Sequence, residues 1–178
     1  MSIWPAYLED IILTFRKQKE FAEKAINQVS DQAFFQTPGE DSNIIAIIIK
    51  HVGGNLASRW TDFLTTDGEK PWRNRDREFI LEPDDDRAGL LALWERGWSA
   101  VIQALGGLPE TDLLKKVKIR GEDHTVFQAI HRSLSHTSYH VGQIVYLCRL
   151  LTKDGWQWIT IPPGQSEQAK TRGGSYLK

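Results

Sequence analysis

Two histidines, His136 and His140, lie four residues apart in a segment whose pattern predicts a helix. At about 100° per residue, such a pair lies roughly 40° apart on one helix face, one turn above the other. Two imidazoles placed this way can bind one metal ion, as they do in helical zinc motifs. A third histidine, His51, lies among apolar residues in another helix-like segment. Three neutral nitrogen donors would leave coordination positions open, which a catalytic metal requires.

The spacing alone leaves open whether the three histidines converge. A helical pair also arises from packing, and a lone buried histidine such as His51 is often a hydrogen-bonded structural residue. His131 lies five residues before His136, roughly 140° around the helix, so it should face elsewhere. Cys148 is expected to be a small buried hydrophobe. The sequence has neither a G-x-S-x-G elbow nor a phosphate-binding glycine loop, so serine hydrolase and nucleotide chemistry lack support.

Hydrophobic periodicity predicts four long helices that position these histidines. They cover residues ~4–29, residues ~42–66, a segment that follows Pro83 and stops at Gly106-Gly107, and residues 125 to ~151. The last begins with a capping box, Thr125-Val126-Phe127-Gln128. Gly53 and Gly54 interrupt the second at a cost of about 1 kcal/mol each, which is tolerable where another helix or a ligand approaches the backbone. Residues 113–120 predict a small hairpin or irregular arm around Gly121.

Four amphipathic segments with almost no strand signal predict an all-α protein, a four-helix bundle. A length of 178 residues predicts a single domain over residues 1–178, with a C-terminal extension at about 153–178. Bundles place metals between facing helices, which is where the three histidines would have to meet.

The composition is that of an ordinary globular protein, with 40% hydrophobic and 25% charged residues. Its 22 basic and 23 acidic residues give a net charge of -1, so no nucleic-acid partner is expected. The single cysteine implies no intramolecular disulfide and a reducing compartment. No signal peptide and no apolar run of membrane-spanning length is seen, so we expect a cytoplasmic protein without a membrane partner.

Two stretches that contain these histidines resemble the DinB/YfiT-like superfamily of metal-dependent bacterial enzymes. One is IKHVGGN at residues 49–55, which carries His51, and the other is HTSYHVGQI at residues 136–144. The stretches SRWTDF at residues 58–63 and WRNRD at residues 72–76 further resemble a little-characterised branch of that superfamily. The resemblance spans most of the chain, and the closing H-x-G-Q-I element is quite specific.

The resemblance implies an up-down-down-up four-helix bundle, often a homodimer, that binds a divalent metal through His51, His136 and His140. Some members of the superfamily are thiol-dependent S-transferases or isomerases that use a bacterial low-molecular-weight thiol such as bacillithiol or mycothiol. Others, including this branch, have no known activity.

The first functional hypothesis is a metal-dependent thiol S-transferase with a small-molecule thiol and an electrophilic substrate as partners. Zinc or nickel suits imidazole ligands, and coordination would supply the thiolate, which is the reacting species. Arginine side chains are expected to hold carboxylates of the thiol, and two amides are expected in the pocket or behind the ligands. These residues are Arg59, Arg73, Arg75, Asn55 and Gln143.

Two alternatives stay open. Three histidines and a water also suit a metal-dependent hydrolase. That reaction usually needs a carboxylate base, and neither histidine helix offers one beside the ligands, since Asp62 lies almost three turns from His51. The third hypothesis is a non-enzymatic, metal-binding stress-response module.

Overall fold

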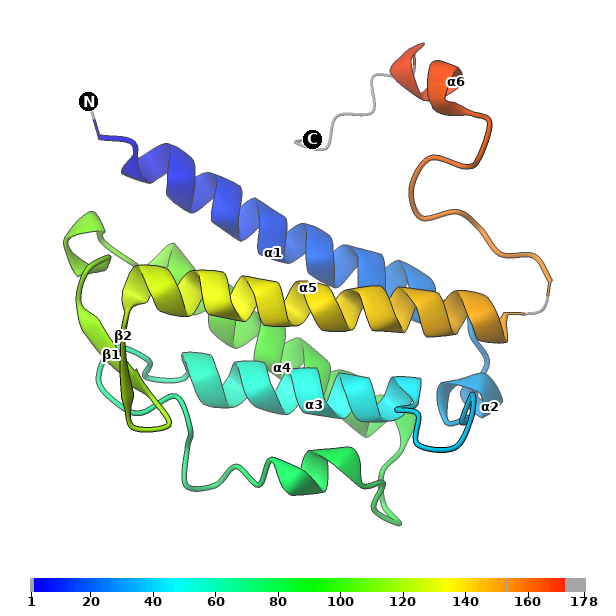
Figure 1. Ribbon diagram of the computed structural model, residues 1–178, viewed down its shortest axis with the longest axis horizontal. Helices are drawn as coiled ribbons and strands as arrows, with labels where there is room; N and C mark the ends of the chain where they lie inside the picture. The colour runs from blue at the N-terminus through cyan, green and yellow to red at the C-terminus, as the bar shows by residue number, and fades with distance from the viewer. Residues whose placement is uncertain (1, 153, 172–178) are drawn as a thin grey trace.

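The computed structural model describes residues 2–152 and 154–171 (Figure 1), so residues 153 and 172–178 of the predicted C-terminal extension lie outside the described residues. The described part contains six α-helices, two short 3-10 helices and one two-stranded sheet. In chain order they are α1 (Trp4–Ile26), α2 (Asp31–Phe34), α3 (Ile45–Trp60), η1 (Asp76–Phe79), α4 (Arg87–Gly106), η2 (Glu110–Asp112), β1 (Lys116–Ile119), β2 (Glu122–Thr125), α5 (Val126–Leu151) and α6 (Ser166–Thr171). The prediction of a mostly helical protein is confirmed.

The four long helices lie side by side (Figure 1). Helices α1 and α5 run in one direction, and α3 and α4 run in the other. The closest packing joins α3 to α4 and α1 to α5. Among the described residues, no helix combines the length and the apolar character that crossing a membrane requires.

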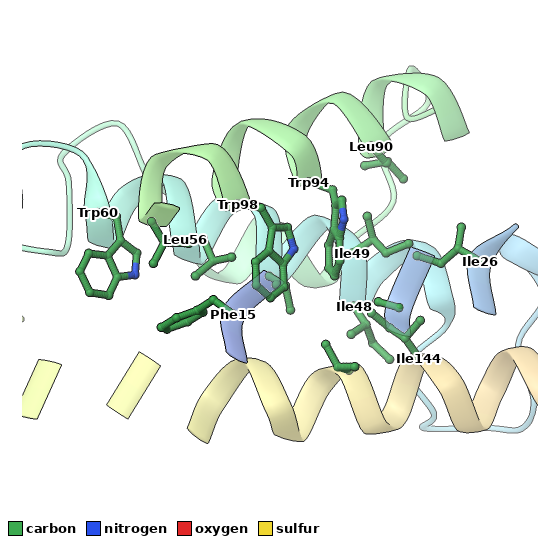
Figure 2. Close-up of a cluster of buried hydrophobic side chains, with 14 of the residues drawn as sticks. Phe15, Ile26, Ile48, Ile49, Leu56, Trp60, Leu90, Trp94, Trp98 and Ile144 are labelled. Atoms are coloured by element: carbon green, nitrogen blue, oxygen red, sulfur yellow. The ribbon is translucent and has the colours of Figure 1, made fainter. Parts of the chain in front are cut away.

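Large aromatic and branched side chains fill the space between these helices (Figure 2). Phe15 of α1 meets Trp60 of α3 and Trp98 of α4 edge-on, with ring centroids 6.4 and 6.3 Å apart. Trp94 packs against Trp98 at 5.2 Å. Burial of this apolar surface holds the helices at fixed distances, so the side chains that they carry are positioned rigidly.

Helix α3 is shorter than the predicted residues ~42–66, since it begins at Ile45 and ends at Trp60. The break at its C-terminus has a local cause. Thr61 adopts an extended conformation, and Asp62 has a left-handed φ of 47°, which a helix cannot continue through. The segment after Trp60 is therefore a turn, and His51 lies near the middle of the helix.

Two glycines allow α3 and α4 to approach closely. A Cβ atom on Gly97 of α4 would lie 2.6 Å from the carbonyl oxygen of Gly53, and one on Gly53 would lie 2.9 Å from that of Leu93. Both neighbours are backbone atoms of packed helices, so neither can move aside cheaply. The predicted reason for a glycine at position 53, the approach of another helix, is what the structure contains.

A β-hairpin leads into α5. Strands β1 and β2 pair antiparallel with Lys116 opposite Thr125, and Gly121 turns between them with a φ of 78°. The Asp67 carboxylate accepts hydrogen bonds from the backbone N–H groups of Arg120 and Gly121 at 2.9 and 2.7 Å. The hairpin is thereby fixed to the loop that follows α3.

The predicted capping box at the start of α5 is confirmed. The Thr125 hydroxyl accepts a hydrogen bond from the Gln128 N–H at 3.1 Å, and the Gln128 side chain accepts one from the Thr125 N–H at 2.8 Å. These two bonds satisfy donors that a helix N-terminus otherwise leaves unpaired. Helix α5 therefore has a fixed start, ten or more residues before the histidine pair.

We predict that Gly97→Ala destabilises the protein by about 1–2 kcal/mol. Overpacking against the Gly53 backbone costs about 1–3 kcal/mol, and the better helix propensity of alanine returns up to about 1 kcal/mol. The matched control is Gly142→Ala in α5, where a Cβ meets nothing within 4 Å. That variant should be neutral or stabilised by about 0.5–1 kcal/mol. Urea unfolding of both variants measures the difference, and equal stabilities would contradict the close helix approach.

Candidate metal centre

The structure brings the three predicted histidines together. His51 extends from α3, and His136 and His140 extend from α5. One ring nitrogen from each lies within 4.8 Å of the other two. The Nε2 atoms of His51 and His136 are 3.1 Å apart. His51 and His140 are buried and His136 is half-buried, so this cluster could hold a metal ion.

A carboxylate orients His51 from behind. The Nδ1 atom of His51 lies 2.8 Å from Oε2 of Glu78, a residue of η1 that is 7% exposed. The ring of Phe79 packs on the same imidazole, with centroids 4.7 Å apart. Since an ionised carboxylate only accepts hydrogen bonds, Nδ1 of His51 carries the proton and Nε2 keeps its lone pair. This is the arrangement that orients histidine ligands in many metal sites.

Glu78 is itself held by a buried guanidinium. The Nε and Nη2 atoms of Arg73 donate to the two carboxylate oxygens of Glu78 at 2.7 and 2.8 Å, and the Arg73 side chain is 1% exposed. Burial alone would raise the pKa of Glu78, but the hydrogen bonds from Arg73 and His51 outweigh it and hold that pKa below its ordinary value. Arg73 also donates to Glu69 at 3.2 Å, and Arg120 donates to the same oxygen at 3.1 Å.

Gly54 makes room for this carboxylate. A Cβ atom at position 54 would collide with Oε1 of Glu78. The glycine pair of α3 therefore serves two neighbours. Gly53 faces α4, and Gly54 faces the group that orients His51.

His140 has an orienting partner on its own helix. The Oε1 atom of Gln143 lies 2.7 Å from Nδ1 of His140. An amide oxygen accepts, so Nδ1 donates and Nε2 of His140 is left as the free nitrogen. Gln143, predicted in the pocket or behind the ligands, thus lies behind a ligand.

His136 lacks such a partner. Its Nδ1 atom is buried and forms no hydrogen bond within the described part of the chain. Burial, and secondarily the neighbouring His140 and His51, lower the pKa of His136 to about 3. Burial also lowers the pKa of His140, against the opposing hydrogen bond to Gln143. These imidazoles are therefore neutral at pH 7, the form in which histidine binds metals.

The cluster fits a divalent ion on geometric grounds. Two imidazole nitrogens that share a tetrahedral zinc ion lie about 3.3 Å apart, given Zn–N bonds of ~2.0–2.1 Å. The 3.1 Å between Nε2 of His51 and Nε2 of His136 is close to that separation. Two of the three rings have hydrogen bonds at Nδ1 that turn Nε2 toward the common centre. The donor set does not distinguish zinc from nickel.

A cavity of about 210 Å³ opens beside His51 and His136. Three of the predicted pocket residues, Asn55, Arg59 and Arg75, line it. Arg73 does not line this cavity, since its guanidinium is committed to Glu78. The cavity is also lined by Ile119, Arg120, Ala129, Arg132 and Ser133.

Two of the site residues that were not predicted come from segments without helical periodicity. Glu78 lies in a 3-10 turn between α3 and α4, and Arg120 lies at the tip of the hairpin. Neither has a spacing relation to the histidines that a sequence pattern could reveal. Arg132 lies on α5 four residues before His136, so the spacing could have predicted that the two lie on the same side of the helix.

Two other side chains lie where they were expected. His131 is exposed, and its Nδ1 donates to the carbonyl of Phe127 at 2.9 Å. Cys148 is fully buried, and burial raises the pKa of its thiol to about 12.

A comparison with known protein families matches the chain to a family whose function is not known. The family described as "Protein of unknown function (DUF1572)" matches residues 2–165, a range that includes all three histidines and Glu78. No curated protein and no solved structure matches the chain significantly.

We predict that Glu78→Gln costs about 3 kcal/mol of stability in the metal-free protein. The substitution leaves the buried Arg73 without its bidentate carboxylate, and breaking a buried pair costs about 3–5 kcal/mol. Glu82→Gln is the matched control, because Glu82 pairs with the exposed Arg77 and a surface pair contributes about 0–1 kcal/mol. Urea unfolding measures both, and similar losses in the two variants would contradict a buried pair.

We also predict that the metal-free protein loses stability as the pH falls from about 6.5 toward 3. The unfolded chain takes up a proton on His136 near its ordinary pKa of 6.5, whereas in the folded chain this pKa is about 3. Between these values the unfolded state binds more protons, so the free energy of unfolding rises with pH and levels off above the window. His136→Asn should reduce the slope between pH 5 and 7, measured by urea unfolding, and an unchanged slope would refute this assignment.

Proposed function

The chain belongs to the DUF1572 family of proteins of unknown function, and we propose that it is a divalent-metal-dependent enzyme that transfers a bacterial low-molecular-weight thiol to an electrophilic substrate. The ligands in this proposal are His51, His136 and His140. The observation that carries it is the convergence of three imidazoles, two of which have hydrogen bonds at Nδ1 that orient the ring.

We place the family within the DinB/YfiT-like superfamily, with an up-down-down-up four-helix bundle as its single domain. The opposite directions of the pairs α1/α5 and α3/α4 (Figure 1) support this assignment, as does the origin of the ligands, one from α3 and two from α5. The homodimer and the cytoplasmic location stay predictions.

A divalent ion at this site, zinc or nickel by ligand preference, would lower the pKa of a coordinated thiol and supply thiolate at neutral pH. The chain's own residues explain why the sulfur should come from a cosubstrate. Cys148 is the single cysteine, and it is buried with a pKa raised to about 12, so it stays protonated and inaccessible. The protein itself therefore offers no reactive thiolate.

Charge and hydrogen bonding around the site support thiol transfer over hydrolysis. A carboxylate does lie near the ligands, but it comes from η1 and not from either histidine helix. Both oxygens of Glu78 are engaged by Arg73, and one also accepts from His51 on the side of the ring away from the cluster. No carboxylate among the described residues lines the adjoining cavity, so a base for hydrolysis is lacking there.

The test compares metal content and thiol consumption in the same preparations. We predict one ion per chain in the wild-type protein and loss of that ion in His51→Ala, His136→Ala and His140→Ala. His131→Ala, an exposed histidine of α5, is the matched control and should keep it. The rate of bacillithiol or mycothiol consumption with chlorodinitrobenzene, measured above the spontaneous reaction, should require the metal and fall to the spontaneous rate in the three ligand variants.

Three outcomes would replace the proposal. Undiminished metal content in the ligand variants would exclude this site. Metal-dependent ester or amide cleavage without any thiol would favour the hydrolase. Bound metal that raises the melting temperature while neither reaction proceeds would favour the non-enzymatic module.

A further inference from the structure

The cavity beside the histidines is strongly positive. Four guanidinium groups line it, one from α3, one from the loop before η1, one from the hairpin and one from α5. They belong to Arg59, Arg75, Arg120 and Arg132. Within the described chain, no acidic side chain lines the cavity with them. Such a concentration of like charge is unfavourable unless something negative balances it.

Two of the four arginines have a carboxylate partner outside the cavity. Arg120 donates to Glu69 at 3.1 Å, and Arg75 lies 3.4 Å from Asp76. These carboxylates do not fully neutralise the two arginines, because Glu69 also pairs with Arg73.

The other two arginines have no carboxylate partner in the described residues. Arg132 contacts Nε2 of His124 at 3.0 Å through its Nη1 atom. Arg59 forms no hydrogen bond there at all, and its Nη1 atom is buried without a partner. Burial, followed by repulsion from Arg132 and Arg73, lowers the pKa of Arg59 to about 10, so the group is still charged at neutral pH. Arg59 as a whole is half-buried, and a partly desolvated cation without an ion-pair partner is costly to the fold.

The Arg59 side chain packs against the backbone of the loop that follows α3. A Cβ atom on Gly68 would lie 2.9 Å from Cδ and 3.0 Å from Nη1 of Arg59, so a larger residue at position 68 would force the arginine to shift. The Gly68 N–H in turn donates to the carbonyl of Lys118 in the hairpin at 2.8 Å. The unpaired group therefore lies between this loop and the cavity.

Two uncharged polar groups complete the lining. Asn55, one turn after His51 on α3, is buried, and its amide has no hydrogen-bond partner within the described chain. Ser133 accepts a hydrogen bond from the Trp60 indole at 3.0 Å, which leaves its own hydroxyl hydrogen to donate. Arginine, amide and hydroxyl groups thus supply most of the polar lining on the side away from the histidines, and oxyanions are the ligands that accept from all three together.

We propose that this cavity is an anion site that binds a small oxyanion group of charge near -2, either a pair of carboxylates or one phosphate, through Arg59 and Arg132 with Arg75 and Arg120 at its edge. A volume of about 210 Å³ is below the ~300–1,000 Å³ of pockets for drug-sized ligands, so the cavity holds one end of a ligand or a small dianion. His51 and His136 line the same cavity, which directs the other end of the ligand to the histidine cluster. The anion site follows from the lining of the cavity alone. The further identification of its ligand as part of the thiol cosubstrate rests on the proposed function.

The test uses the full-length, metal-free protein, so that the anion cannot bind to a metal ion. Isothermal titration with succinate and with inorganic phosphate separates the two sources of charge. We expect saturable binding of one of them, weakened by added sodium chloride. Arg59→Gln/Arg132→Gln should weaken that binding at least tenfold, and Arg132→Gln alone, at an exposed residue that should not affect folding, should weaken it severalfold.

Arg96→Gln is the matched control, since Arg96 is an exposed arginine of α4 outside the cavity. It should leave anion binding unchanged. The Arg59→Gln/Arg132→Gln variant should melt at or above the wild-type temperature, because it removes a half-buried charge without an ion-pair partner and the repulsion between the two arginines. Absence of saturable binding by both anions, or equal binding by the arginine variants and the wild-type protein, would overturn the proposal. Loss of metal binding or of thiol transfer would leave this result unaffected, so the two proposals can fail separately.

Discussion

The histidine cluster depends on the buried ion pair between Arg73 and Glu78. This pair keeps Glu78 ionised although the residue is 7% exposed, and the ionised carboxylate fixes the tautomer and the direction of His51. It also joins the segment after α3 to the helix itself, since Glu78 contacts His51 of α3 while Arg73 reaches on to Glu69 in the loop. The absence of a side chain at Gly54 is what lets the pair lie against α3. A neutral glutamine could still accept from Nδ1 of His51, as Gln143 does for His140, but it would leave the buried Arg73 without an ionised partner.

The parts of the protein that local sequence rules govern could be predicted. Apolar periodicity marked the long helices, the 3.6-residue repeat placed His136 and His140 on one side, and Thr125 with Gln128 formed the expected cap. The end of α3 was missed because the left-handed conformation of Asp62 has no strong signature in a non-glycine residue.

The parts that depend on tertiary contacts could not be predicted. Glu78 and Arg120 reach the site from a 3-10 turn and a hairpin tip, where no repeat relates them to the histidines. Arg73 was expected to face a ligand, and the sequence contained no sign that it would instead be buried against a carboxylate. A charged residue in a polar loop is usually solvated, so burial of this one is a property of the fold and not of its local sequence.

The hairpin has a role beyond closing one end of the molecule. Thr125 is both the last paired residue of β2, opposite Lys116, and the N-cap of α5. No linker separates strand from helix, so the pairing of the two short strands fixes the point at which α5 begins. A one-residue slip between β1 and β2 would turn the side chains of one strand to the opposite face, and α5 would then have to enter the bundle from a different position. The strand pairing sets the entry of α5, and the apolar face of the helix sets its rotation, so the two together place the histidines of the site.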